Sequence, residues 1–109
     1  MATFRYHLNS RWFKGNCHIH TPASDGGTSI ADLSAMYAGQ GYDFLCRTDH
    51  WVASHVAADT EEYPLLWLDG VELHGRDHGD SYYHVFCLGK FTGLDERMGI
   101  VAGMEAVRA

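Results

Sequence analysis

Two histidines that stand two positions apart, His18 and His20, restrict the fold of this 109-residue chain more than any other feature. Side chains alternate between the two faces of an extended strand, so on a strand both imidazoles would point to the same side. Pro22 and the polar, glycine-containing run at 24–27 follow at once and are typical of a loop. We therefore expect a strand near Asn16–His20 that ends in a histidine pair.

Three further apolar runs predict strands, and each has a polar candidate residue at or near one end. The runs are Tyr42–Thr48, Leu65–Leu73 and Tyr83–Gly89. The first two suit strands that are covered on both faces in a parallel sheet. His50 follows the first run, Glu72 lies at the end of the second, and His84 stands at the head of the third. The four strands would bring histidines and carboxylates together.

Helical patterns occupy the connections between these runs. Ser29, with Asp32 three positions later, matches a capping box, and apolar residues repeat at helical spacing until Gly39. Two further helices are expected over Trp51–Thr60 and Asp95–Arg108. The order strand, helix, strand, helix, strand, strand, helix is an α/β pattern, and no linker divides it. We expect one domain over residues 1–109.

Charge and composition narrow the possible partners. The formal net charge is -6, with 14 acidic and 8 basic residues, which disfavours stable binding to nucleic acid or to an anionic membrane. No run of about 18 apolar residues predicts a membrane span, and no signal peptide is indicated. The three cysteines, Cys17, Cys46 and Cys87, lie in apolar strand patterns, and their odd number argues against a disulfide framework. We expect a cytoplasmic protein with buried thiols.

The mixture of imidazoles and carboxylates at strand ends is typical of a metal site. In α/β proteins such residues gather at the carboxyl edge of the sheet, where chemistry is usually placed. Imidazoles together with Asp25 and Glu72 suit zinc, manganese or iron, and a carboxylate such as Glu72 can bridge two ions. Two such ions would bind a phosphoryl oxygen and ionise water at neutral pH. The sequence thus predicts a metal-dependent hydrolase.

Four motifs in a fixed order resemble a known family. They are His18-Ile19-His20 with Ser24-Asp25-Gly26, then Thr48-Asp49-His50, then Glu72 after Gly70-Val71, and finally His84 ahead of Leu88-Gly89. In this order they are similar to the motifs of the PHP family, named for polymerase and histidinol phosphatase. The segments before His18 and before Thr48 are most similar to its CehA/McbA-like branch, which includes carbaryl-hydrolase-like enzymes.

The resemblance implies a fold, a reaction and a set of ligands. The fold would be the N-terminal half of a distorted (β/α)7 TIM-like barrel, and the reaction hydrolysis of a small-molecule phosphoester by a metal-activated water. The implied metal ligands are His18, His20, Asp25, His50, Glu72 and His84. The complete domain would hold two or three divalent ions, and Glu72 would bridge two of them. Asp49 would be a supporting residue beside the ligands.

The chain departs from the family pattern at its C-terminal end. Family members continue further and supply a later histidine, then an aspartate and another histidine, whereas this sequence stops at Ala109. We expect a fragment of a longer protein; a second polypeptide that completes it, or a genuinely incomplete barrel, are the alternatives. A half barrel leaves a strand edge unpaired, which predicts self-association.

Ordinary structural roles stand beside these assignments. His18 and His20 can be a hydrogen-bonded pair on a half-buried strand, Glu72 an exposed carboxylate, and His84 an edge residue. His74 would share the face of Glu72 and is a candidate contact to substrate or metal, or else a solvated loop residue.

Arg76 is a second candidate substrate contact, because guanidinium groups match phosphate oxygens. His7, His55 and His78 fall outside the motifs. Two other functions stay open: a noncatalytic metal-binding module that needs a second polypeptide, and an amidohydrolase or carbamate-ester hydrolase.

Overall fold

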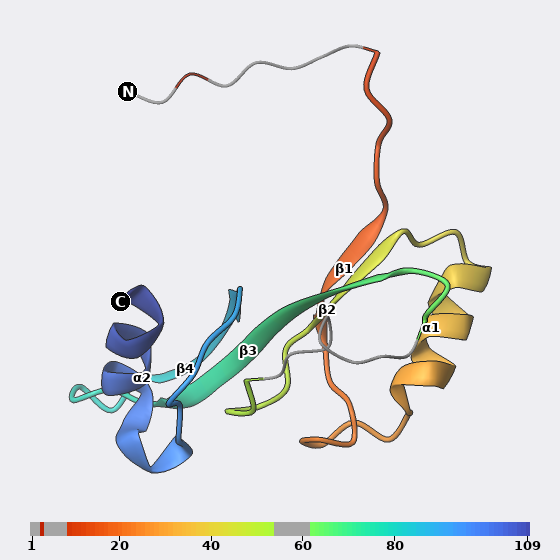
Figure 1. Cartoon of the computed structure of the whole chain (residues 1–109). Helices are drawn as coiled ribbons and strands as arrows, with labels where there is room; N and C mark the ends of the chain where they lie inside the picture. Colours follow the sequence, from red (N-terminus) through yellow and green to blue (C-terminus); the bar gives the residue numbers. More distant parts are fainter. Residues whose placement is uncertain (1–2, 4–8, 54–61) are drawn as a thin grey trace.

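The computed structural model describes residue 3 and residues 9–53 and 62–109, and Figure 1 shows their arrangement. Within these residues one four-stranded sheet, in the order β1-β2-β3-β4, carries two α-helices. The elements are β1 (Gly15–Ile19), α1 (Ile30–Gly39), β2 (Phe44–Arg47), β3 (Leu66–Arg76), β4 (Tyr82–Leu88), the 3-10 helix η2 (Glu96–Met98) and α2 (Gly99–Arg108). The predicted mixed α/β class is confirmed, and the curled sheet has the form of part of a barrel.

The direction of each strand relative to its neighbour agrees with the length of the connection between them. β1, β2 and β3 are parallel neighbours, and parallel strands need a long crossover such as the one that contains α1. Only residues 77–81 separate β3 from β4, and there the Asp77 N–H donates to the carbonyl oxygen of Ser81 at 3.0 Å. β4 is therefore antiparallel to β3. β3 extends to Arg76, beyond its predicted end at Leu73, because residues 74–76 pair with β4.

Helix α1 forms where its capping pattern predicts. The hydroxyl of Ser29 accepts the N–H of Asp32 at 3.1 Å, which satisfies a donor that the first helical turn leaves free. The helix ends before Gly41, whose φ of 79° suits glycine. Its apolar side covers one buried cluster of the sheet, formed by Ile19, Leu45 and Trp67. This packing buries Ile19, the last residue of β1, and Leu45 of β2.

Helix α2 covers a second buried cluster on the same face of the sheet. The cluster contains Trp51, Val71, Leu73 and Ile100. Gly103 permits close approach, because a Cβ atom there would lie 2.7 Å from Cη2 of the Trp51 ring. The single helix expected over Asp95–Arg108 is divided: residues 96–98 form η2, and α2 begins at Gly99, whose φ of 81° breaks the helical path between the two.

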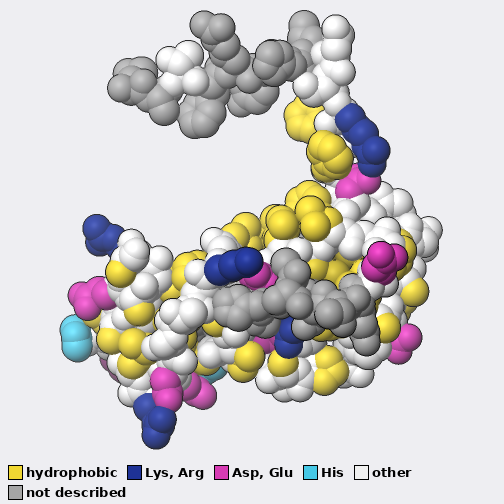
Figure 2. Space-filling model, viewed as in Figure 1, with side chains coloured by type: hydrophobic (Ala, Val, Ile, Leu, Met, Phe, Trp, Pro, Cys, Tyr) yellow, Lys and Arg dark blue, Asp and Glu magenta, His cyan; other side chains and the backbone are white. Residues whose placement is uncertain are grey.

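The opposite face of the sheet is open and partly apolar. Leu66 and Leu68 of β3 are 60% and 40% exposed, and Phe86 and Leu88 of β4 are each 49% exposed. Trp67, which points to the other face, is buried against α1. Figure 2 shows hydrophobic side chains at the surface between the two helical ends of the molecule. The polar side chains of His18, His20 and Glu72 come together on this same face.

Three remaining expectations concern a helix, the cysteines and the membrane. The helix expected over Trp51–Thr60 falls mainly on residues 54–60, which lie outside the described residues, and residues 51–53 are not helical. The three cysteines are free thiols; Cys46 is buried, and Cys17 and Cys87 are partly buried. No helix in the described part of the chain has both the length and the apolar content needed to cross a bilayer.

Candidate metal centre

The histidine pair lies at the carboxyl end of β1, on the open face of the sheet. Its two Nε2 atoms, of His18 and His20, are 3.3 Å apart, so both imidazoles point to one place, as their spacing predicts. The register between β1 and β2 shifts by one residue between Asn16 and Ile19. The side-chain oxygen of Asn16 accepts the His18 N–H at 3.0 Å and so holds this irregular stretch of backbone.

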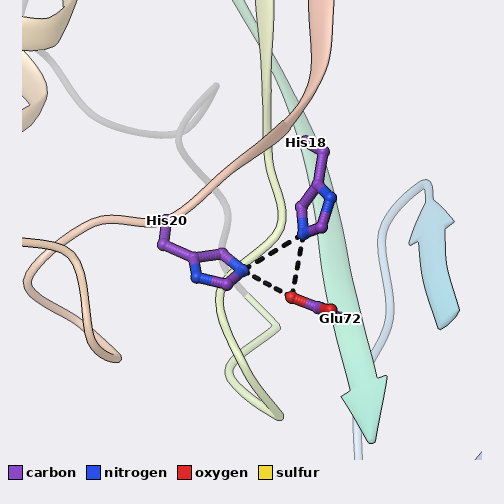
Figure 3. Close-up of side chains that lie close together, drawn as sticks. All are labelled: His18, His20 and Glu72. Carbon is purple, nitrogen blue, oxygen red and sulfur yellow. Dashed lines mark hydrogen bonds and ion pairs between the residues drawn. The ribbon is translucent and has the colours of Figure 1, made fainter. Parts of the chain in front are cut away.

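Glu72 of β3 is the centre of the site. Its side chain is almost fully buried, so it is not an exposed carboxylate. Oε2 lies 2.9 Å from His18 Nε2 and 2.5 Å from His20 Nε2, as Figure 3 shows. Oε1 lies 2.7 Å from His84 Nδ1. One carboxylate thus meets imidazoles from β1 and from β4, the two outer strands of the described sheet.

The imidazoles keep Glu72 ionised. Burial is the largest influence and would raise the pKa of Glu72, but hydrogen bonds from His18, His84 and His20 together outweigh it. The pKa falls from its ordinary value of 4.5 to about 2. Near neutral pH the site therefore contains a buried negative charge that faces several ring nitrogens.

Asp25 and His50 form a second group with His20. Asp25 Oδ1 lies 2.7 Å from His20 Nδ1, and Asp25 Oδ2 lies 3.4 Å from His50 Nε2. His50 follows β2 and pairs with Glu72 through an isolated parallel bridge, which places it beside Glu72 and the histidine pair. Burial, the largest influence, lowers the pKa of His50, and the opposing effects of Glu72 and Asp25 do not restore it. A neutral imidazole is the form that binds metal.

The carboxylate of Asp49 fixes the turn that follows the histidine pair. Oδ1 accepts from the Thr21 N–H at 2.7 Å and from the Ser24 hydroxyl at 2.6 Å. Oδ2 accepts from the Thr21 hydroxyl and from Arg47 Nε, each at 2.7 Å. Burial would raise the pKa of Asp49, but these donors outweigh it and lower the pKa. Asp49 supports the site by holding the turn that carries Asp25.

His74, a predicted substrate contact, lies inside the histidine cluster. Its Nδ1 is 2.9 Å from His50 Nδ1, and its side chain is less than a quarter exposed. Its Nε2 is 3.1 Å from Oε1 of Glu96, a rim residue contributed by η2. No sequence motif marks Glu96. The residue comes close to His74 only because the chain after β4 turns back towards the site. Its one local signal is its place directly after Asp95, which caps η2.

Arg76, the other predicted substrate contact, is the last residue of β3 and is held by the turn that joins β3 to β4. Its guanidinium donates to the carbonyl oxygen of Asp80 at 2.9 Å and lies 5.5 Å from the ring centroid of Tyr82. His78 is exposed in the same turn, and His7 and His55 lie outside the described residues. Arg76 therefore has local partners, whereas His74 contacts a candidate ligand.

An open pocket of about 420 Å³ lies against the second group. It is lined by Ser24, Asp25, His50, His74, Tyr82, His84 and Glu96. This volume suits a small molecule. Side-chain exposures of 51% for His84 and 44% for His18 show that solvent reaches both ends of the cluster. No lysine or arginine is among the described residues that line the pocket.

The donors fit divalent cations. Ligand atoms within 4.8 Å of one another occur in three groups: His18, His20 and Glu72; His20, Asp25 and His50; and His50, Glu72 and His84. The geometry thus brings together all six residues that the motifs select. Imidazole nitrogens with carboxylate oxygens suit zinc, manganese and iron. His20, His50 and Glu72 each belong to two of these groups, but a neutral imidazole binds one cation at a time, so of the three only Glu72 could serve two cations at once.

No model of a known protein family matches this chain, and no curated protein sequence matches it. A buried carboxylate, four surrounding imidazoles and a more exposed carboxylate can bind cations next to a pocket that is open to solvent.

Proposed function

We propose that this chain carries the metal-binding part of a metal-dependent hydrolase that acts on phosphoesters. One observation carries the proposal: the buried carboxylate of Glu72 has three imidazole nitrogens at 2.5–2.9 Å, supplied by strands on both sides of β3. An ordinary hydrogen-bonded histidine pair does not require this convergence. The PHP family, whose motifs the sequence resembles, combines such ligands with this reaction.

Each residue of the cluster would have its own role in such a site. His18 and His20 would hold a cation together with Glu72, and Glu72 would also help His84 to hold a neighbouring cation. Asp25 would complete the neighbouring group. A divalent cation lowers the pKa of coordinated water towards neutrality and polarises an ester oxygen. The buried charge of Glu72 offsets the positive charge of the cations, and the pocket leaves space for a substrate.

The proposed fold is the first half of a distorted (β/α)7 barrel. Helices on one face of a curled sheet and donors at one rim support it. In a complete barrel, further strands would cover the exposed side chains of Leu66, Leu68 and Phe86. The same exposure favours the alternative that the chain works only with a second polypeptide.

A second candidate substrate class is an uncharged ester, either a carboxylic or a carbamate ester. The described residues that line the pocket include Asp25 and Glu96 but no lysine or arginine. A phosphate dianion would approach these carboxylates and would depend on bound cations for attraction. An uncharged ester avoids that repulsion.

Metal content tests the site directly. The chain is incubated with Mn²⁺ or Zn²⁺, passed through gel filtration, and analysed by mass spectrometry for bound metal. The wild type is expected to retain metal, and the double variant with His18→Ala and His20→Ala is expected to lose most of it. His78→Ala removes an exposed histidine outside the cluster and is the matched control. Equal metal content in the double variant and the wild type would refute the site.

Activity separates the substrate classes. The metal-loaded chain is assayed on nitrophenyl phosphate, bis(nitrophenyl) phosphate, nitrophenyl acetate and a naphthyl carbamate. Turnover of the phosphate esters that is lost in the histidine double variant supports the first proposal, and turnover of only the uncharged esters supports the second. Metal binding without turnover of any ester favours the module that needs a partner chain.

A further inference from the structure

His50 stands between two groups of ligands and offers a ring nitrogen to each. Its Nε2 lies 3.4 Å from Asp25 Oδ2, in the group of His20, Asp25 and His50, here called the Asp25 group. Its Nδ1 lies 3.6 Å from Glu72 Oε2, in the group of His50, Glu72 and His84, here called the His84 group. A neutral imidazole has one lone pair and one N–H, so only one of these nitrogens can bind a cation.

A chain of two contacts leads from His50 to a carboxylate at the rim. His50 Nδ1 is 2.9 Å from His74 Nδ1, and His74 Nε2 is 3.1 Å from Glu96 Oε1. An ionised carboxylate only accepts hydrogen bonds, so His74 donates to Glu96 from its Nε2–H. The Nδ1 atom of a neutral His74 then has a lone pair. It can accept only if His50 has its proton on Nδ1.

We propose that Glu96 and His74 are positioning residues that fix the tautomer of His50. With its proton on Nδ1, His50 presents the lone pair of Nε2 to the Asp25 group and is withheld from the His84 group. Metal-binding histidines commonly donate their second ring N–H to an acceptor, which orients the ring. Here that acceptor is a second histidine, itself oriented by a carboxylate. The inference rests on the proposed function, since it takes His50 to be a metal ligand.

Helix α2 and its neighbourhood hold this chain of contacts in place. The indole N–H of Trp51 donates to the carbonyl oxygen of His74 at 3.1 Å. The Trp51 ring is buried against Leu73 and Ile100 and packs closely on Gly103 of α2. The 3-10 helix that supplies Glu96 leads directly into α2. Both positioning contacts therefore depend on the same packed unit.

The wild-type protein provides the first test. Long-range ¹H–¹⁵N correlation spectra at about pH 8 report which ring nitrogen of each neutral histidine carries the proton. In the metal-free chain we expect His50 to be protonated on Nδ1 and His74 on Nε2, while the exposed His78 shows the mixed pattern of a solvated imidazole. With Zn²⁺ as the probe, the metal-induced shift of His50 is expected on Nε2. A His50 protonated on Nε2 would overturn the inference.

Three variants test the role of each contact through the dissociation constant of Zn²⁺. His74→Phe keeps a ring but has no acceptor, and it is expected to weaken binding of the cation held by His50 on the order of 10- to 100-fold. His74→Asn places an oxygen near the position of Nδ1 and is expected to restore most of the affinity. Glu96→Ala is expected to weaken binding when His74 is present and to change nothing when Asn replaces His74.

The outcomes separate this inference from the proposed function. If the wild type binds no Zn²⁺, the proposed function fails, and the spectra of the metal-free chain still decide the tautomer of His50. If His74→Phe folds, as thermal unfolding will show, and binds Zn²⁺ as tightly as the wild type, His74 has no positioning role. If that variant does not fold, the wild-type spectra alone support or overturn the assignment.

Discussion

The carboxylate of Asp49 accepts hydrogen bonds from both the backbone N–H and the hydroxyl of Thr21, each at 2.7 Å. Both residues are almost fully buried. The two contacts join the residue that precedes one candidate ligand, His50, to the residue that follows another, His20. A single buried side chain therefore sets the relative position of ligands that lie far apart in the sequence.

Removal of this carboxylate should destabilise the whole domain. Asp49→Ala leaves the donors of Thr21, Ser24 and Arg47 without their buried partner, and we expect a loss of about 3–5 kcal/mol in the free energy of unfolding. Urea denaturation followed by circular dichroism measures it. Glu105→Ala, which removes an exposed acid from α2, should stay within about 0.5 kcal/mol of the wild type. Similar losses for both variants would contradict this role of Asp49.

Close packing of α2 should make Gly103 intolerant of a methyl group. In Gly103→Ala the new Cβ would meet the Trp51 ring at 2.7 and 2.9 Å, and such overpacking typically costs about 1–3 kcal/mol. Gly39→Ala at the end of α1 meets no atom within 4 Å and should stabilise the chain by about 0.4–1 kcal/mol. Thermal unfolding of the two variants should shift in opposite directions, and a stabilised Gly103→Ala would count against the close contact.

Cations should stabilise the folded chain if they bind the histidine cluster. At a free ion concentration about 100 times the dissociation constant, mass action contributes about 2.7 kcal/mol, which corresponds to a rise of about 10 °C or more in Tm for a domain of this size. Differential scanning fluorimetry with Mn²⁺, Zn²⁺ or a chelator measures the shift. The variant that lacks both His18 and His20 should show little of it, and an equal shift there would place the ions elsewhere.

Asp95 should titrate well below an ordinary aspartate. Hydrogen bonds from the side chain and backbone of Arg97 lower the pKa of Asp95 from 3.8 to about 2. Because the folded-state pKa is depressed, the stabilisation is present above about pH 3.8 and is lost as the pH falls towards 2. Carboxyl ¹³C shifts should show a midpoint near 2, and Arg97→Gln should raise it. A wild-type midpoint near 3.8 would rule out the cap contact in solution.

The uncovered face of the sheet should cause self-association. Leu66, 60% exposed on that face, offers apolar surface, and the outer strands β1 and β4 each lack a partner strand on one side within the described residues. Sedimentation velocity at rising concentration should show association that Leu66→Lys reduces. Met36→Lys changes a side chain of α1 that is equally exposed, at 61%, and should have little effect. A wild type that stays monomeric throughout the series would argue against this surface.

The gathering of the candidate ligands could be predicted because its signals lie in the local strand pattern. Alternation along a strand orients His18 and His20 together, and parallel strands meet at a common edge, which brings His50 and Glu72 to them. Helix α1 was equally predictable, since the Ser29 cap lies in the sequence itself.

The rest of the site depends on contacts that no local pattern encodes. Glu96 arrives from η2, and its position is set by the packing of α2 on Trp51 and Leu73. The extra residue in β1 leaves the spacing of the histidine pair unchanged, so periodicity gives no sign of it. The sequence marks Asp49 only as a neighbour of candidate ligands, but three of its hydrogen bonds come from Thr21 and Ser24 in the turn after His20, a long-range contact that only the fold reveals.

The half-exposed edges of the histidine cluster have a practical consequence for its handling. If the cluster binds cations as proposed, they can enter and leave it without any opening of the protein, and its metal content will follow the surrounding buffer. Nickel and copper bind nitrogen donors more tightly than manganese or iron. If the cluster binds cations as proposed, a nickel-charged column would load the chain with a foreign ion, and metal content should be measured on material prepared without tag, resin or chelator.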